Sequence, residues 1–151
     1  LYNEWAIVYM MMGERSKALK MLERSLELDD RFDQTYLLLG DYYRSVEDWE
    51  KAAQAYEKAV ELSPDLIQAH SALGLAYARL GMLDKAVEEN KKVLELAPDN
   101  YISHRNLALL YKELGRLDEA LAEARKALGL APEKDKKALR AFIVKLEEAL
   151  K

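Results

Sequence analysis

Apolar residues recur along this chain at intervals of three and four, the spacing of amphipathic helices, in segments separated by short turns. Within residues 67–100, one apolar stripe ends before Gly81, a residue suited to the left-handed position that closes a helix. The next stripe, over residues 83–96, stops before Pro98, which cannot continue a helix. The pattern predicts two antiparallel helices joined by a tight turn.

This helical hairpin recurs with a period of 34 residues, which separates Pro64 from Pro98 and Pro98 from Pro132. Three other residue types keep the same step at four positions each: Tyr9, Tyr43, Tyr77 and Tyr111; Ala18, Ala52, Ala86 and Ala120; Leu28, Leu62, Leu96 and Leu130. A period held by independent residue types is the signature of a repeat architecture. We therefore predict repeats at residues 1–32, 33–66, 67–100 and 101–134, followed by a helix at residues 135–151.

The motif within each repeat resembles that of the tetratricopeptide repeat (TPR) family, W-x2-L-G-x2-Y followed by A and P. The third repeat carries it as His70, Leu73, Gly74, Tyr77, Ala86 and Pro98. The second repeat has Tyr36 at the first position, the fourth has His104 and Ala108, and the degenerate first repeat has Asp30 in place of the proline. The resemblance implies an all-α fold: a TPR solenoid, or right-handed superhelix, of four 34-residue helix–turn–helix repeats with a C-terminal capping helix.

Small residues are expected to have two roles in these hairpins. Gly13, Gly81 and Gly115 stand at three hairpin turns, and Glu47 stands at the remaining one, which we expect to close without a glycine. Ala6, Gly40, Gly74 and Ala108 lie in the middle of the first helices. We expect them to contact the alanines that recur every 34 residues in the second helices, Ala18, Ala52, Ala86 and Ala120.

The two ends of the chain differ. Residues 135–151 carry one apolar face, formed by Leu139, Phe142, Ile143, Leu146 and Leu150, which predicts a helix that caps the last repeat. The first repeat begins two residues late and has no such cap, and the chain starts with Leu1 rather than Met. These features predict a truncated first repeat in a fragment of a longer protein.

Composition narrows the possible chemistry. The absence of cysteine excludes disulfides and thiolate catalysis, and the formal net charge of −4 argues against nucleic acid as a partner. No apolar run reaches the roughly 18 residues of a membrane span, so we expect no membrane insertion. No targeting signal opens the chain, and we assign it to the cytoplasm by default.

The titratable side chains predict no catalytic or metal site. His70 and His104 occupy the same place in successive repeats, where we expect packing residues rather than metal ligands. The chain has no phosphate-binding loop, nucleophile elbow or zinc motif. We therefore predict no enzymatic activity, no cofactor and no metal.

The TPR resemblance implies that the first helix of each repeat lines a concave peptide-binding groove. Carried onto this chain, the inner positions are Asn3, Ile7, Met10 and Met11 in the first repeat, Gln34, Leu37, Asp41, Arg44 and Ser45 in the second, Gln68, Ser71, Leu75 and Arg79 in the third, and Ile102, Arg105, Asn106, Leu109 and Lys112 in the fourth. Aliphatic side chains alternate there with hydrogen-bonding groups. Such a mixture is typical of surfaces that bind an extended peptide or an amphipathic helix.

Some TPR domains hold the terminal carboxylate of a peptide with Lys, Asn and Arg side chains from three inner helices. By this resemblance, Asn106, Lys136 and Arg140 fall on three of the five positions, whereas Ser71 and Leu75 replace the Lys and Asn of the first helix. The resemblance thus implies a partial anion pocket at the C-terminal end of the groove. The alternative is an ordinary solvated face of the capping helix.

These observations favour a non-catalytic scaffold that binds a peptide segment of a partner protein in its groove. A second hypothesis is a self-assembly element whose copies associate through the uncapped first repeat, where Tyr2 and Trp5 are expected to be partly uncovered. A third is a regulatory arm of a larger protein.

Overall fold

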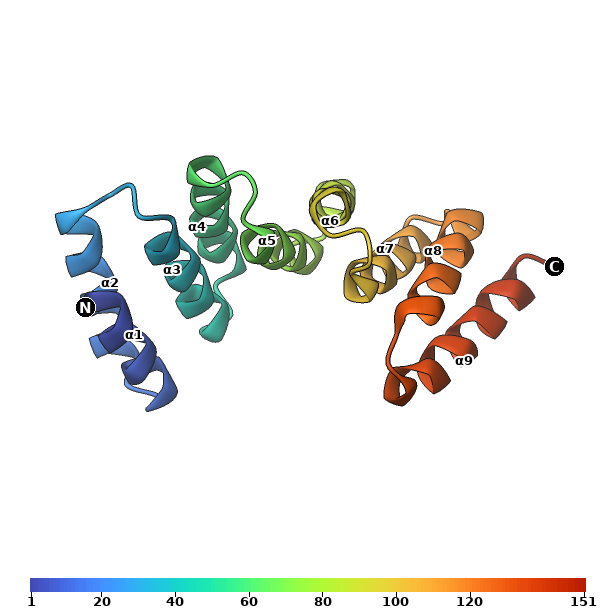
Figure 1. Ribbon diagram of the computed structural model, residues 1–151, viewed down its shortest axis with the longest axis horizontal. Coiled ribbons are helices and arrows are strands. Elements are labelled where there is room, and N and C mark those ends of the chain that lie inside the picture. Colours follow the sequence, from blue (N-terminus) through green and yellow to red (C-terminus); the bar gives the residue numbers. More distant parts are fainter. The chain divides into compact units, whose positions relative to one another are not determined.

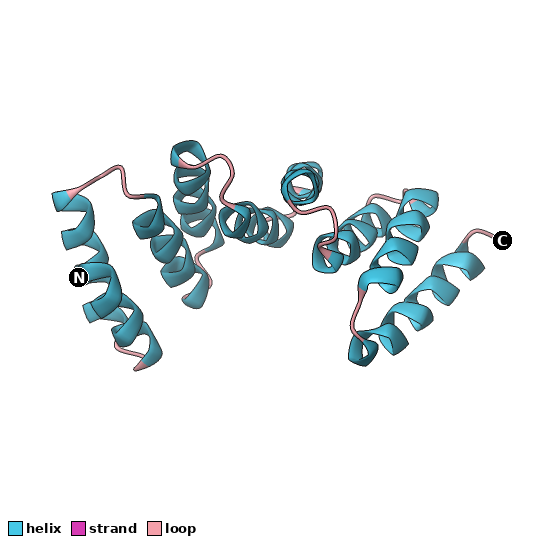
Figure 2. Cartoon of the chain, in the orientation of Figure 1, coloured by secondary structure: helices cyan, strands magenta, loops and turns pink.

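The computed structural model describes all 151 residues as nine α-helices without a strand (Figure 2). The helices are α1 (Tyr2–Met11), α2 (Arg15–Leu28), α3 (Asp33–Ser45), α4 (Trp49–Leu62), α5 (Ile67–Arg79), α6 (Leu83–Leu96), α7 (Tyr101–Glu113), α8 (Leu117–Leu130) and α9 (Glu133–Ala149). From α2 onward, equivalent helices up to α8 begin 34 residues apart. The predicted all-α fold is confirmed. None of the nine helices combines the length and the apolar composition that a membrane span requires.

The chain forms two compact units, residues 1–80 with α1–α5 and residues 81–151 with α6–α9 (Figure 1). In the first unit, each helix packs on the next along the chain, and α1 also packs on α3. In the second unit, α6, α7, α8 and α9 pack successively on one another. The core of both units consists mainly of alanines at the helix crossings, with larger side chains such as Tyr56, Leu22 and Leu146 filling the space between them.

Three hairpin turns close as the glycine pattern predicts. Gly13, Gly81 and Gly115 have φ angles of 75°, 74° and 74°, in the left-handed region that glycine adopts without steric cost. Glu47 occupies the fourth turn with a φ of 60°. This hairpin therefore closes without a glycine, as expected. Its turn instead has a glutamate in the left-handed conformation that glycine favours.

We expect Glu47→Gly to stabilise the protein by about 1 kcal/mol, because it removes the β-carbon that disfavours the left-handed conformation. Thermal unfolding followed by circular dichroism measures the gain. Glu47→Ala serves as the control, since it removes the charge and keeps the β-carbon. An equal gain in Glu47→Ala would show that the charge, rather than the backbone conformation, is the cause.

The closest approach at Gly40 is made by an aromatic ring. A β-carbon built on Gly40 would lie 2.3 Å from Cε1 of Tyr56, and the three nearest heavy atoms all belong to that ring. The expected contact with Ala52, which is also fully buried on α4, stays a prediction, and the closest neighbour of Gly40 is Tyr56. The larger Tyr56 side chain on the same helix, which is fully buried, occupies the space above the α3 backbone.

A buried polar network joins α1, α2 and α3. The Thr35 hydroxyl, which is fully buried, lies 3.0 Å from the Asn3 amide nitrogen and 3.1 Å from the Ser25 hydroxyl. Equivalent positions of the later repeats carry Ala69 and Ser103 for Thr35, and Ala59 for Ser25. The contact between the first and second repeats is thus more polar than the contact between the second and third. It is also less extensive, since α2 packs less on α3 than α4 does on α5.

The C-terminal helix α9 begins at Glu133, two residues before the predicted start. Leu139, Ile143 and Leu146 are buried, and Leu139 packs with Ala127 and Ala131 at the end of α8. The predicted apolar face is therefore present, with one exception. Leu150 follows the last helical residue and is 40% exposed.

Candidate functional site

The first unit contains a cleft of about 390 Å³ between α1 and α3. Ile7, Met10 and Met11 form its apolar wall, and Asp41, Arg44 and Ser45 form the facing polar wall; Gly13 and Arg15 close one end. All six wall residues are among the inner-face positions that the sequence predicts. Ile7 and Met11 are 41% and 83% exposed, so this wall offers uncovered apolar surface.

Tyr56, on α4, hydrogen-bonds to the polar wall of the cleft. Its hydroxyl donates to Oδ1 of Asp41 at 2.8 Å, and the same oxygen accepts from Nη2 of Arg44 at 3.0 Å. Burial, together with the neighbouring carboxylate of Asp41, raises the pKa of Tyr56, so this hydroxyl remains a donor at neutral pH. The ring reaches Asp41 because Gly40 has no side chain to block its path.

The remaining predicted residues of the first unit lie outside this cleft. Asn3 is half-buried and exchanges two hydrogen bonds with Thr35, at 3.0 and 3.2 Å, so its amide is already engaged. Leu37 is also half-buried. The other predicted residues, Gln34 on α3 and Gln68, Ser71, Leu75 and Arg79 on α5, are exposed.

In the second unit, the predicted residues lie on α7 and α9. Two contacts connect these helices: the Tyr101 hydroxyl donates to Asp135 at 2.8 Å, and Nζ of Lys112 lies 5.7 Å from the centre of the Phe142 ring. The first contact is one turn before Arg105 and Asn106, and the second is one helical turn beyond Leu109. The predicted side chains of α7 thus occupy the segment between the two contacts.

The three residues of the predicted anion pocket differ in whether their side chains already have a hydrogen-bond or ion-pair partner. Asn106 donates to Oδ1 of Asn90 on α6 at 3.4 Å, and Lys136 pairs with Glu133 of its own helix at 2.5 Å. The hydrogen bond from Lys136 lowers the pKa of Glu133. Arg140 is exposed and has no carboxylate within ion-pair distance. Arg140 is therefore the available cation of this set.

The two histidines are buried and hydrogen-bonded, as expected of packing residues. Nε2 of His70 lies 2.7 Å from the carbonyl oxygen of Pro64, and Nε2 of His104 lies 3.0 Å from that of Pro98. The motif position occupied by histidine thus ties the first helix to the proline turn before it. Nδ1 of His104 also lies 2.5 Å from the Glu123 carboxylate.

The second histidine, on α7, contacts Glu123, which is paired with Lys126 on α8. Burial by itself favours the neutral form of Glu123, but hydrogen bonds from Lys126 and His104 outweigh it and lower the pKa of this carboxyl. Nζ of Lys126 lies 2.8 Å from Glu123. No group of three or more His, Asp or Glu side chains is arranged to hold a metal ion.

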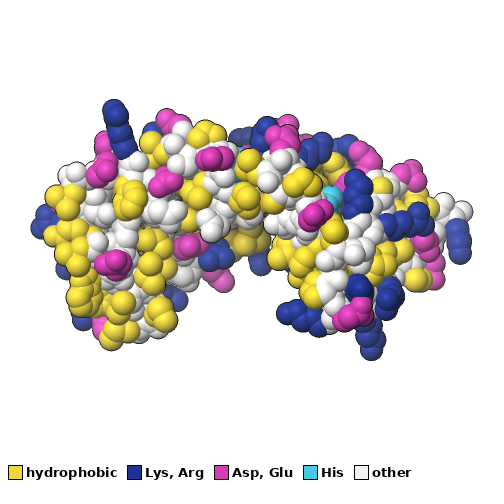
Figure 3. Space-filling view, in the orientation of Figure 1, with side chains coloured by type: hydrophobic (Ala, Val, Ile, Leu, Met, Phe, Trp, Pro, Cys, Tyr) yellow, Lys and Arg dark blue, Asp and Glu magenta, His cyan; other side chains and the backbone are white.

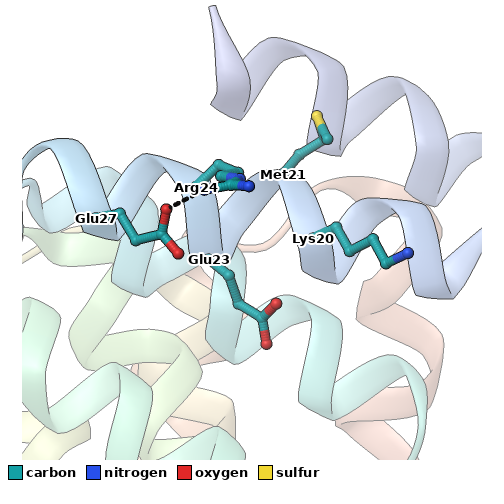
Figure 4. Close-up of a pocket in the computed structure, with 5 residues that line it drawn as sticks. All are labelled: Lys20, Met21, Glu23, Arg24 and Glu27. Atoms are coloured by element: carbon teal, nitrogen blue, oxygen red, sulfur yellow. Dashed lines mark hydrogen bonds and ion pairs between the residues drawn. The ribbon is translucent and has the colours of Figure 1, made fainter.

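A further depression, of about 350 Å³, is lined by α2 alone and offers little to a ligand (Figure 4). Arg24 pairs with Glu27 at 2.6 Å within the helix, and Lys20, Glu23 and Met21 complete the lining. A single apolar side chain among alternating charges is an ordinary solvated helix face. We regard the cleft between α1 and α3 as the candidate site of the first unit because it sets apolar side chains opposite hydrogen-bonding groups.

Sequence reasoning missed two side chains that shape this site. Tyr56 lies on a second helix, which the groove assignment excludes, and Arg15 follows the hairpin turn. A signal for Tyr56 was present, since the equivalent positions carry Leu22, Asn90 and Ala124 and only this repeat has an aromatic residue there. No comparable signal marks Arg15.

Helix–turn–helix hairpins that recur every 34 residues define a helical-repeat protein. Family models described as TPR repeat or tetratricopeptide repeat match residues 40–81, 67–100 and 90–122. The chain belongs to the tetratricopeptide repeat family. Members of this family are typically non-catalytic protein-interaction modules.

Solved structures of similar fold include several of MamA. One, of MamA from AMB-1, superimposes with a TM-score of 0.84 at 27% identity and covers 99% of this chain and 80% of its own. Another structure of MamA gives 0.82 at 28% identity, covering 91% and 78%. The first TPR domain of Spaghetti (RPAP3), bound to the HSP90 peptide SRMEEVD, gives 0.72 at 22% identity and covers 76% and 90%. Comparison with curated protein sequences found no significant match.

Proposed function

We propose that this chain is a scaffold that binds a peptide segment of a partner protein on the inner faces of its first helices. The observation that carries the proposal is the cleft between α1 and α3, which sets exposed apolar side chains opposite hydrogen-bonding groups. A peptide requires both kinds of surface, since its side chains bury apolar area while its backbone needs polar partners. The peptide-bound TPR domain of RPAP3 supports the proposal by showing that this fold can hold such a segment.

The inner face of the second unit is proposed as a second contact region for the same kind of ligand. Arg105, Lys112, Lys136 and Arg140 make the α7–α9 region basic, and Leu109 is 44% exposed among them. Arg140 is available to pair with a carboxylate, whereas Lys136 must exchange its partner Glu133. Acidic or C-terminal segments are the ligands that such a surface attracts.

The proposal predicts that binding depends on Ile7. Peptides selected from a displayed random library against the wild-type protein should bind Ile7→Ser about tenfold more weakly, since the substitution removes buried aliphatic surface from the complex. Val8→Ser is the matched control, because Val8 is 43% exposed on the same helix and does not line the cleft. Fluorescence anisotropy measures the dissociation constants, and thermal unfolding checks that both variants remain folded.

Equal affinity of Ile7→Ser and wild type for every selected peptide would contradict the proposal for the first unit. The same peptides, tested against Lys136→Ala/Arg140→Ala, assess the second unit. Lys137→Ala/Lys145→Ala provides a control with the same change in charge on the same helix.

Self-association is a second candidate function, which the outer face of α1 favours. Leu1, Trp5, Val8 and Met12 recur there at helical spacing and are all exposed, and hydrophobic side chains gather at this edge of the first unit in Figure 3. Because α1 is apolar on both its inner and outer faces, a second copy could cover the outer one. Sedimentation over a range of concentrations tests this function, and a strictly monomeric protein at high concentration would exclude it.

A further inference from the structure

We propose that the cleft between α1 and α3 selects segments in which an aliphatic side chain stands next to a carboxylate. This inference rests on the proposed function and specifies the ligand of the same site. It follows from two features of the cleft, an adaptable apolar wall and an unbalanced positive charge.

The apolar wall suits aliphatic side chains of varied shape. Two of its three members, Met10 and Met11, are unbranched thioethers that can change rotamer to fit a neighbour, and Met11 is almost fully exposed. Ile7 adds a stiffer surface at the centre of the helix. A bound leucine, isoleucine or methionine side chain could therefore bury its surface here without a preformed pocket of one shape.

The charge of the cleft is set by two guanidinium groups and one carboxylate. Arg15 has no carboxylate within ion-pair distance, and Arg44 uses one nitrogen, Nη2, on Asp41. A guanidinium carries five N–H donors in a planar fork, so both arginines retain donors for a ligand carboxylate. The cleft therefore carries a net positive charge that a bound anionic side chain would neutralise.

Asp41 does not offset this preference by attracting a cationic ligand. One of its oxygens already accepts from both Tyr56 and Arg44, and the carboxylate is only partly exposed. A ligand lysine could pair with the other oxygen, Oδ2, only within a cleft that two arginines line. The same arrangement that attracts acidic segments thus rejects basic ones.

Three peptides of equal length test the inference, each blocked at both ends so that terminal charges play no part. The first has two leucines flanked by glutamates, the second replaces the glutamates with lysines, and the third replaces the leucines with serines. Fluorescence anisotropy at low salt should show that the first peptide binds at least about tenfold more tightly than either of the others.

Charge-removing variants identify the group responsible. Arg15→Gln should weaken binding of the glutamate–leucine peptide by up to about fivefold, the range of an exposed ion pair, and the effect should shrink as salt is added. Arg31→Gln is the matched control, because Arg31 is also exposed, forms no ion pair, belongs to the same unit and lies outside the cleft. An equal effect of the two variants would overturn the inference, since it would reduce the preference to general charge attraction.

The outcomes separate this inference from the proposed function. If the lysine peptide binds as tightly as the glutamate peptide and loses affinity in Ile7→Ser, the peptide-binding function stands and the charge preference is wrong. Equal binding of the serine peptide would also overturn it, because the apolar wall would then contribute nothing. If Ile7→Ser changes the binding of none of the three peptides, both are wrong. A concentration-dependent rise in sedimentation coefficient that Ile7→Ser abolishes would identify a second copy as the occupant and overturn the inference.

Discussion

Gly40→Ala should destabilise the protein by about 2–3 kcal/mol, although alanine normally favours a helix over glycine by about 1 kcal/mol. The added β-carbon would stand 2.3 Å from Cε1 and 2.5 Å from Cδ1 of Tyr56, distances that no carbon pair tolerates. Tyr56 is fully buried, so its ring cannot move aside without disturbing the core around it. Both tryptophans, Trp5 and Trp49, lie in the first unit, and tryptophan fluorescence during urea unfolding follows the change there.

A second glycine provides the control for helix propensity. Gly129 also lies within a helix, α8, and a β-carbon built on it meets no heavy atom within 4 Å. Gly129→Ala should therefore stabilise the protein by about 0.5–1 kcal/mol. A stabilising Gly40→Ala would show that the Tyr56 ring does not occupy the space above α3.

A compensating substitution should restore much of the loss. The first repeat carries Ala6 and Leu22, both fully buried, at the positions equivalent to Gly40 and Tyr56. Gly40→Ala/Tyr56→Leu reproduces that pair, and the double variant should be more stable than Gly40→Ala alone. A double-mutant cycle with Tyr56→Leu measures the coupling free energy between the two positions.

Peptide binding should also depend on the contact between Gly40 and Tyr56. Because Tyr56 positions Asp41, which in turn holds Arg44, the double variant should keep its fold and release the polar wall of the cleft. Gly40 therefore affects the site as well as the core. It lets the buried Tyr56 reach Asp41 and so fix the conformation of this surface carboxylate.

The sequence predicted the helices well because their signals are local. Proline at 64, 98 and 132 and glycine at three turns stop the helices directly, and the apolar stripes between them need no knowledge of distant residues. The end of the cap is the exception. Leu150 continues the apolar pattern of α9, but it follows the last helical residue and stays 40% exposed, since periodicity alone does not provide a neighbouring surface to cover.

The candidate site was only partly predictable, because its geometry depends on contacts between helices. Repeat positions identified Ile7, Asp41 and Arg44 as neighbours on one face, and the structure brings them into one cleft. The same reasoning assigned Asn3 to that face, where its amide is instead held by Thr35 of the next repeat. Side-chain periodicity gives the direction in which a residue points, whereas its hydrogen-bond partner depends on which residues the neighbouring helix presents.

Leu146→Ala should destabilise the second unit by about 3 kcal/mol, because α9 covers the end of this unit with a small number of large side chains. Leu146 is 1% exposed, and truncation to alanine removes its contacts and leaves a cavity that the surrounding helices fill only in part. The measurement is urea unfolding followed by far-ultraviolet circular dichroism, since the second unit contains no tryptophan.

Val144→Ala is the matched control for this substitution. Val144 lies two residues away on the same helix and is 50% exposed, so its truncation should change the free energy of unfolding by no more than about 0.5 kcal/mol. The contrast distinguishes a loss of packing from a loss of helix stability, because both variants place alanine in α9. If Leu146→Ala and Val144→Ala have equal effects, α9 does not cap the repeats, and the buried face formed by Leu139, Ile143 and Leu146 does not stabilise this unit.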